Sequence, residues 1–268
     1  MAARMDSRSL YVGKTTEMRL PRQDTPLSLP AEQPWEAIAR DEALLDQVEP
    51  GAPPLVRWWL AASRAVVVGL GLRYRLASVV DVRRCEADGV AVLERRAGGG
   101  ALLLDDQMLC GAVCVPTGSI SSDVTESYRW LGDDLAARLR SIGLGQARRI
   151  EVDEARADVA AVRARPDALG GVLASTCYGL LSPHEVSIGP KKVVGLAQVR
   201  RRHAALFVFG VLLRDQAGLA DYLQVPTEQT RQQLRQELTK RTLGIGELTS
   251  RSASAAAAAI VGATPCEP

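Results

Sequence analysis

The 268-residue chain has few histidines, no Cys-x-x-Cys pair and no long apolar run. Two histidines leave too few ligands for an ordinary zinc or iron site, and a membrane-spanning helix needs about 20 consecutive apolar residues. The cysteines are odd in number and widely spaced, so a disulfide framework is not expected; they are Cys85, Cys110, Cys114, Cys177 and Cys266. The N-terminal segment carries charge throughout and lacks the apolar core of a secretory signal, which predicts a cytoplasmic protein.

The chain also has little net charge, because 33 lysines and arginines oppose 31 aspartates and glutamates. A domain that binds nucleic acid is usually strongly basic, so neither a nucleic acid nor a membrane is an expected partner. Hydrophobic residues make up 47% of the chain, which is enough for a sizeable core. Lysine is scarce, with four against 29 arginines, and this makes the adjacent Lys191 and Lys192 noticeable.

Apolar patterning predicts an irregular alternation of helices and strands. Helices are expected over 32–48, 76–87, 123–142, 216–223 and 227–242. Strands are expected over 55–60, 65–70, 90–96, 101–104, 108–115, 148–152, 185–188, 192–200 and 204–213. The stretch 153–180 has no clear periodicity. Since several adjacent strands look antiparallel, the predicted fold is α+β (mixed α/β), with one central mixed sheet flanked by helices.

Three consecutive glycines follow a predicted strand in the segment Arg95–Ala101, which reads RRAGGGA. Glycines let the backbone approach a ligand closely, and the two arginines can hold a carboxylate or a phosphate. The spacing matches neither a dinucleotide-binding loop nor a P-loop. A glycine-rich turn with solvent-exposed arginines explains this segment equally well.

A second segment, Lys192–Gln198 (KVVGLAQ), places a lysine at the start of a predicted strand, where it can orient a carbonyl or stabilise an anion. Cys177 lies fifteen positions before Lys192 in a loop of small residues. A thiolate is a good nucleophile near neutral pH, and a nearby cation lowers the pKa of a thiol. Taken alone, Lys192 is more simply an exposed hairpin residue and Cys177 a small buried one.

The order of these segments resembles the biotin/lipoate protein ligase superfamily over about residues 31–213. Supporting matches are Asp41–Leu45 and Thr125–Arg129. The resemblance implies a class II synthetase-like biotin/lipoate ligase catalytic domain over 31–225, an N-terminal extension over 1–30 and a helical C-terminal segment and tail over 226–268. It also implies an acyl- or substrate-binding site made by Arg95, Arg96, Gly98, Gly99, Gly100, Ala101, Gly195, Ala197 and Gln198.

Within the superfamily, Cys177 is similar to the cysteine of the octanoyltransferases and lipoyl amidotransferases, which lies just before the lysine segment. The resemblance implies that Cys177 accepts an octanoyl or lipoyl group from a carrier thioester and passes it to a lysine of a lipoyl domain. Lys192 is expected to lower the pKa of the thiol and steer the carbonyl. Partners would be acyl carrier protein and lipoyl-domain proteins (glycine cleavage H protein or dehydrogenase E2 subunits), with no cofactor or metal required. His184 is a weaker candidate for a proton shuttle.

Four positions depart from the family pattern, because apolar or thiol side chains replace groups that are usually polar or aromatic; they are Ala97, Leu104, Cys110 and Phe209. These changes predict a more apolar pocket and weaken the case for nucleotide binding. Two alternatives stay open: an ATP-dependent lipoate-protein ligase, and a non-catalytic member that binds acyl groups or a carrier protein. The basic cluster Arg200–Arg202 suits docking of an acidic carrier protein as well as it suits a solvated strand end.

Overall fold

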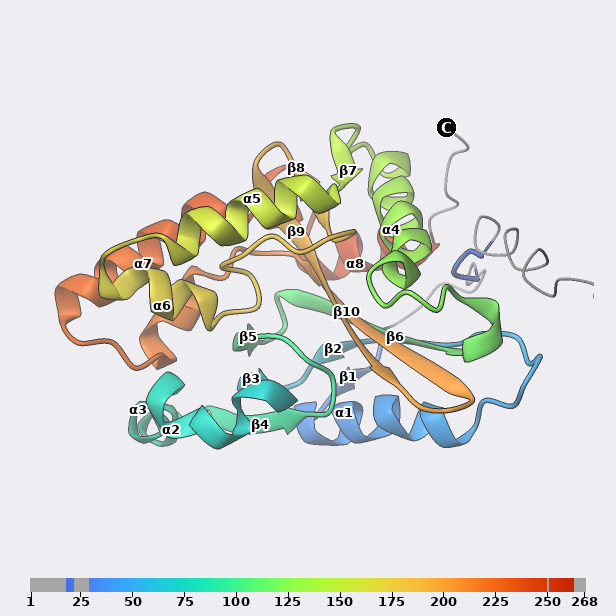
Figure 1. The fold of residues 1–268 in the computed structure, drawn as a ribbon, viewed down its shortest axis with the longest axis horizontal. Coiled ribbons are helices and arrows are strands. Elements are labelled where there is room, and N and C mark those ends of the chain that lie inside the picture. Colours follow the sequence, from blue (N-terminus) through green and yellow to red (C-terminus); the bar gives the residue numbers. More distant parts are fainter. Residues whose placement is uncertain (1–17, 22–28, 250, 263–268) are drawn as a thin grey trace, which may run out of the picture.

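The computed structural model describes residues 18–21, 29–249 and 251–262. Its strands form a seven-stranded sheet with the order β1–β2–β6–β10–β9–β8–β7 and a three-stranded sheet with the order β4–β3–β5 (Figure 1). The larger sheet contains β1 (Ala31–Glu32), β2 (Leu55–Ala61), β6 (Met108–Pro116), β10 (Ala204–Leu212), β9 (Lys191–Arg200), β8 (Val186–Ile188) and β7 (Ala147–Arg149). The smaller sheet contains β3 (Ala65–Gly69), β4 (Ala91–Arg95) and β5 (Leu102–Leu104).

The centre of the larger sheet is the antiparallel pair β6 and β10. Every residue of β6 is buried, and so is every residue of β10 except Val208. Uninterrupted apolar runs of this kind are typical of strands that are covered on both faces. At the edge of the sheet, β1 pairs parallel with β2, so the sheet is mixed.

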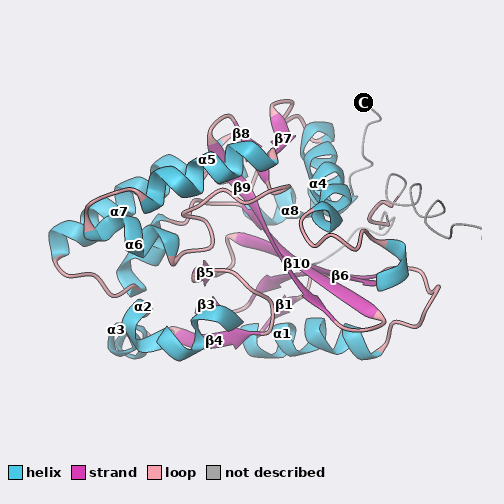
Figure 2. Ribbon diagram, in the orientation of Figure 1, coloured by secondary structure: helices cyan, strands magenta, loops and turns pink. Residues whose placement is uncertain are grey.

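One face of this sheet is covered by α4 (Arg129–Ser141) and α8 (Ala253–Gly262). Apolar residues of α4 recur every four positions and pack onto the sheet; they are Leu131, Leu135 and Leu139. The end of α4 is set by Gly143, whose φ of +103° few other residues adopt readily. Figure 2 shows α4 and α1 on opposite sides of the central strands.

The opposite face is covered by α1 (Pro34–Ala43) and by the smaller sheet. Ala37 of α1 and Val67 of β3 belong to one buried cluster with Trp59 and Cys110 of the larger sheet. The outer face of the smaller sheet packs against helices from several parts of the chain: α2 (Leu76–Val79), α3 (Val82–Ala87), α6 (Ala168–Ala174) and α7 (Glu228–Arg241), with α5 (Val152–Arg163) beside α6.

A fully buried arginine joins three parts of the chain that are distant in sequence. The Nε of Arg138 donates to Asp134, and its terminal nitrogens donate to the carbonyl oxygens of Leu20, Ile260 and Val261. The last two carbonyls belong to the end of α8, where a cation is favourable. Arg138 therefore ties the N-terminal described segment and α8 to α4.

The predicted α+β fold with a central mixed sheet flanked by helices is confirmed, but the expectation of a single sheet is wrong. Residues 62–64 separate β2 from β3, and β3 then pairs with β4 and β5 in a sheet of its own. The helix predicted over 76–87 is two helices, because Val80 bridges to Leu223 and Asp81 accepts the N–H of Arg84 to begin α3. The stretch 153–180 contains α5 and α6.

Two predicted boundaries also shift. The helix predicted over 32–48 begins at Pro34, because residue 32 pairs in β1. It ends in a 3₁₀ turn. The strand predicted over 148–152 ends at Arg149, where the chain turns into α5. Predictions for residues 1–17, 22–28 and 263–268, including Cys266, lie outside the described residues. Within the described part of the chain, no helix is both long and apolar enough to span a bilayer.

Candidate active site

Cys177 lies in the turn that follows α6, and this turn contacts the triple-glycine loop backbone to backbone. The N–H of Cys177 donates to the carbonyl of Ala101 at 2.8 Å, and the N–H of Ala101 donates to the carbonyl of Ser175 at 2.8 Å. A Cβ on Gly100 would lie 2.4 Å from the carbonyl carbon of Thr176, so only glycine fits there. Two segments that are distant in sequence therefore form one surface.

Gly99 of this loop lies close to the thiol. A Cβ at this position would lie 3.7 Å from the Sγ of Cys177. Gly99 has a φ of +107°, a left-handed conformation that favours glycine. Its missing side chain keeps the approach to the half-buried Sγ open.

The thiol borders a cleft with two lobes. The first lobe, of about 350 Å³, is lined by Cys177 together with Leu72 and Leu180. The second lobe, of about 320 Å³, is lined by Tyr128 and Gln198 among others. Both lobes share four lining residues: Gly99, Ser182, Glu185 and Leu196. The lobes therefore adjoin, and a substrate that reaches Cys177 from one lobe can extend into the other.

Lys192 is fully buried and lines neither lobe. Its Nζ donates to the carbonyl oxygens of Cys177 at 2.7 Å and Leu180 at 3.2 Å, and it pairs with the Glu185 carboxylate at 2.5 Å. An ammonium group has three N–H donors, so these partners use all of them. The lysine thus lies next to the cysteine turn, as the sequence predicted, but it holds the backbone of that turn.

Glu185 is the acidic partner to which the sequence analysis gave no role. Its carboxylate also accepts the N–H groups of Ser182 at 2.9 Å and Leu196 at 3.1 Å. Burial raises the pKa of Glu185 above the ordinary carboxyl value, while the neighbouring Lys192 acts in the opposite direction. Nothing local in the sequence signals this pair, because the two residues meet only when β8 and β9 form their hairpin.

The position of Tyr178 explains why residue 195, within the lysine segment, is a glycine. Its hydroxyl donates to the carbonyl of Gly210 at 2.7 Å and accepts the N–H of Gly195 at 3.3 Å. These two glycines are paired across β9 and β10, and a Cβ on Gly195 would lie 2.9 Å from the phenol ring. The Nζ of Lys192 lies 4.9 Å from the centre of the same ring, so Tyr178 is enclosed on several sides.

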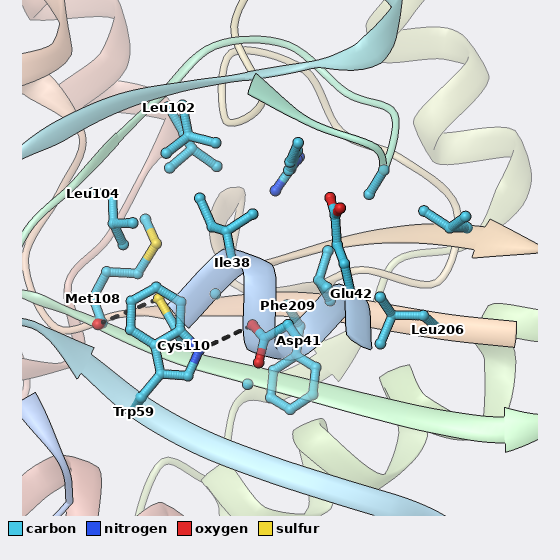
Figure 3. Close-up of a pocket in the computed structure, with 17 residues that line it drawn as sticks. Ile38, Asp41, Glu42, Trp59, Leu102, Leu104, Met108, Cys110, Leu206 and Phe209 are labelled. Atoms are coloured by element: carbon cyan, nitrogen blue, oxygen red, sulfur yellow. Dashed lines mark hydrogen bonds between the residues drawn. The ribbon is translucent and has the colours of Figure 1, made fainter. Parts of the chain in front are cut away.

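A small apolar cavity, of about 60 Å³, lies between α1, the smaller sheet and strands β6 and β10 (Figure 3). All four positions that depart from the superfamily pattern line it: Ala97, Leu104, Cys110 and Phe209. Cys177 packs against the buried cluster that forms part of its wall. These four residues line this apolar cavity and neither lobe of the open cleft.

Two neighbouring carboxylates of α1 support the cavity and the glycine loop. The carboxylate of Asp41 accepts the Nε1 of Trp59 at 3.0 Å and an Nη of Arg57 at 2.5 Å, and burial raises its pKa to about 7 (Figure 3 shows the bond to Trp59). Glu42 accepts the backbone N–H of Arg96 at 2.8 Å and pairs with its Nε at 3.1 Å. Arg96 therefore holds the loop to α1.

Arg95 differs from its neighbour, because its guanidinium points to the thiol. One terminal nitrogen lies 3.9 Å from the Sγ of Cys177 and donates to the carbonyl of Gly98 at 2.9 Å. Arg95 also lines the apolar cavity, so it stands between that cavity and the thiol. It forms no ion pair with a carboxylate in the described part of the chain.

Comparison with known proteins identifies the family of this chain. Residues 33–260 match the lipoyl protein ligase A/B catalytic domain. The chain belongs to this family. The superfamily resemblance predicted from the glycine and lysine segments is thereby confirmed.

Relatives within this family include proteins named octanoyltransferase LipM. The protein of Geobacillus kaustophilus is 25% identical and covers 80% of this chain and 74% of its own length. That of Moorella thermoacetica is 27% identical, with coverages of 83% and 77%. Among solved structures, a lipoate-protein ligase A bound with ATP has a TM-score of 0.62 at 22% identity, covering 86% of this chain and 81% of that chain. A bipartite lipoate protein ligase from Thermoplasma acidophilum, described together with its E2 lipoyl domain, has a TM-score of 0.60 at 23% identity. The match covers 83% of this chain and 74% of that chain.

In this lipoyl protein ligase domain, the end of the lysine segment shapes the second lobe. Ala197 and Gln198 both line it. The Nε2 of Gln198 donates to the carbonyl of Val124 and to the hydroxyl of Ser127, both at 3.1 Å. Gln198 thereby fixes the loop that precedes α4.

Two other sequence candidates have structural partners elsewhere. His184 is buried, with Nδ1 2.8 Å from an Nη of Arg149 and Nε2 3.4 Å from Glu126, and burial lowers its pKa. These contacts give no support to a proton shuttle at Cys177. In residues 18–21, 29–249 and 251–262, no three His, Cys, Asp or Glu side chains are grouped so that they could hold a metal ion.

The basic cluster Arg200–Arg202 lies at the end of β9 that is opposite to Lys192. Eight extended residues separate Lys192 from Arg200, which corresponds to about 26 Å. Arg200 donates to the carbonyl oxygens of Ser121 and Ser122, and Arg201 pairs with Asp46. Two of the three arginines are therefore engaged within the chain. This arrangement favours a structural role at the strand end over docking of a carrier protein near Cys177.

Proposed function

We propose that this protein is an octanoyltransferase of protein lipoylation that carries the acyl group on Cys177. The observation that carries the proposal is the half-buried thiol of Cys177, which borders an open cleft and lies against a glycine loop and an arginine. The relatives named octanoyltransferase LipM, at 25–27% identity, support octanoyl as the transferred group.

The proposed chemistry has two half-reactions. The Cys177 thiolate attacks the thioester carbonyl of an acyl carrier, so a new C–S bond forms and the carrier thiolate leaves and takes up a proton. The neutral amine of an acceptor lysine then attacks the acyl-enzyme, the amide forms, the amine proton is released and the Cys177 thiolate leaves. The N–H groups of Gly99 and Gly100 have no acceptor among the described residues, so they are available to the acyl oxygen in both steps.

In this proposal the acyl tail enters the apolar cavity behind Arg95, and the two lobes of the cleft take the carrier arm or the acceptor lysine. The donor is acyl carrier protein, and the acceptors are lipoyl-domain proteins such as glycine cleavage H protein or dehydrogenase E2 subunits. ATP is not needed, because a thioester is already an activated acyl group and its exchange onto another thiol costs little free energy. A cysteine at the cleft has no use in a ligase that forms an acyl-adenylate.

Intact-protein mass spectrometry tests this proposal. Mixing the protein with octanoyl carrier protein, without ATP, is expected to add one octanoyl group that maps to Cys177. Addition of a lipoyl domain should then remove the group from the enzyme and place it on the domain lysine. No adduct without ATP, together with lipoate-dependent pyrophosphate release when ATP is added, would favour the ligase alternative.

The cavity predicts acyl-chain selectivity. Leu104→Ala removes buried atoms from the cavity wall, so a decanoyl donor is expected to gain about tenfold in kcat/KM relative to octanoyl, at about 0.8 kcal/mol for each additional buried methylene. Leu103→Ala is the matched control, since Leu103 faces the other cluster on the same strand. Both variants lose stability, but only the first should change the ratio. An equal ratio in both would place the acyl tail elsewhere.

A further inference from the structure

The segment that follows β3 forms part of the rim of the first lobe. This rim segment, Leu70–Arg75 (LGLRYR), is a six-residue 3₁₀ helix, and its Leu72 lines the lobe together with Cys177. Its first residue is attached to the triple-glycine loop, because the N–H of Leu70 donates to the carbonyl of Ala97 at 3.2 Å. The side chains that the rim segment presents to solvent therefore have a fixed place relative to the thiol.

The rim segment exposes an aromatic ring and an aliphatic side chain. Tyr74 is 88% exposed and Leu70 is 46% exposed. No other large apolar side chain in the described part of the chain is as exposed as Tyr74. Side chains three positions apart in a 3₁₀ helix lie above one another, so Tyr74 lies one turn above Gly71, which also lines the lobe. Tyrosine is enriched where proteins contact one another, so an exposed ring at this rim favours a protein partner.

The charge of the rim segment is positive, because it contains two exposed arginines and no acidic residue. Arg75 lies one 3₁₀ turn from Leu72 of the lobe wall, and its side chain forms no ion pair or hydrogen bond within the described residues. Arg73 lies 3.9 Å from Glu94, and an exposed pair at this distance contributes little. An arginine without a partner beside an exposed tyrosine is complementary to an acidic protein surface.

We propose that the rim segment Leu70–Arg75 docks the acidic body of the acyl carrier protein, so that its thioester arm enters the first lobe. This inference rests on the proposed function, in which Cys177 accepts the acyl group from a carrier thioester. A long arm lets the protein body stay at the rim while the carbonyl reaches the thiol. An acceptor lysine has only a four-carbon stem, so its domain would have to approach the thiol more closely than a body held by Tyr74 and Arg75. The basic cluster Arg200–Arg202 lines neither lobe and offers no such path.

The test compares two donors that share one arm: octanoyl carrier protein, and octanoyl-pantetheine, which lacks the protein body. Rapid mixing followed by intact-protein mass spectrometry gives the second-order rate constant for acylation by each donor. Arg75→Glu is expected to lower the ratio of the carrier constant to the pantetheine constant about tenfold, because it places like charges opposite each other. Arg75→Lys keeps the charge and should retain at least half of the wild-type ratio. Tyr74→Ala, which removes the exposed ring, is expected to lower the ratio about fivefold.

Arg202→Glu is the matched control, because it reverses the charge of an exposed arginine in the turn after β9. Its ratio is expected to stay within about twofold of the wild type. A loss in Arg202→Glu without a loss in Arg75→Glu would place the carrier at the basic cluster and overturn the proposal. Equal ratios in the wild type, Arg75→Glu and Tyr74→Ala would overturn it as well. So would slower transfer from the acylated Arg75→Glu enzyme to a lipoyl domain with an unchanged donor ratio, because the rim segment would then bind the acceptor.

Failure of the docking surface and failure of the proposed function give different results. If neither donor acylates the wild-type protein, the proposed function of Cys177 is wrong. The docking surface is then tested by binding alone, with isotope-labelled octanoyl carrier protein titrated with the Cys177→Ser protein and followed by NMR. Adding Arg75→Glu to this background is expected to raise the dissociation constant about tenfold. An unchanged dissociation constant would overturn the docking surface whatever the acylation experiment shows.

Discussion

Replacing Cys177 with serine is expected to abolish acyl transfer, by on the order of a thousandfold or more, while the fold stays intact. A serine hydroxyl is almost un-ionised near neutral pH, so it neither attacks the carrier thioester nor leaves readily from an acyl-enzyme. The side chain is half-buried beside polar groups and an open cleft, so the oxygen fits where the sulfur was. Transfer of radiolabelled octanoate to a lipoyl domain measures the loss, and circular dichroism checks the fold.

The other cysteines provide the controls. Burial raises the pKa of Cys85 and Cys114 to about 11 and that of Cys110 well above the usual thiol value. All three should therefore alkylate far more slowly than Cys177 in the native protein. Cys266 is replaced by serine throughout the series, so that it does not contribute. An octanoyl adduct on Cys85, Cys110 or Cys114, or full activity in Cys177→Ser, would refute the proposed mechanism.

The sequence predicted those parts of the site whose signals are local. A triple-glycine segment after a strand indicates close backbone approach, and Gly100 indeed contacts the backbone of Thr176. The apolar run 204–213 predicts a buried strand, and β10 is the central strand that carries Gly210 against Tyr178. No single segment shows in which order the segments of the site should follow one another along the chain. That order came from the resemblance to the family.

What the sequence could not supply are contacts between side chains that meet only after folding. Taken alone, Lys192 looked like an exposed residue of a hairpin. In the folded protein it is buried and pairs with Glu185, which lies on the segment before β8. Arg95 and Arg96 looked equivalent, yet Glu42 of α1 pairs with one and leaves the other beside the thiol. The smaller sheet was missed because alternation of apolar residues identifies strands but does not say with which strand each one pairs.

Replacing Lys192 with methionine is expected to destabilise the protein by about 3–5 kcal/mol, because the buried carboxylate of Glu185 loses its ion-pair partner. Lys192 is 0% and Glu185 2% exposed, so solvent does not compensate. The double variant with Glu185→Gln is expected to regain most of the loss, since no lone charge stays buried. Urea unfolding of the single and double variants gives the free energies of unfolding.

The pH dependence of the single variant provides a further check. Burial already raises the pKa of Glu185, and loss of Lys192 removes an opposing influence, so the folded-state pKa rises further above the unfolded value. Stability of Lys192→Met should then be greatest below the ordinary carboxyl pKa and fall as pH increases through the raised value. Lys191→Met is the matched control: it is the adjacent, half-buried lysine, and no ion pair or hydrogen bond of its side chain occurs within the described residues, so a change within about 0.5 kcal/mol is expected. If Lys192→Met were as stable as Lys191→Met at neutral pH, the ion pair would have no structural role, and the placement of the Cys177 turn would have to depend on its backbone hydrogen bonds to Ala101 and on the Tyr178 contacts.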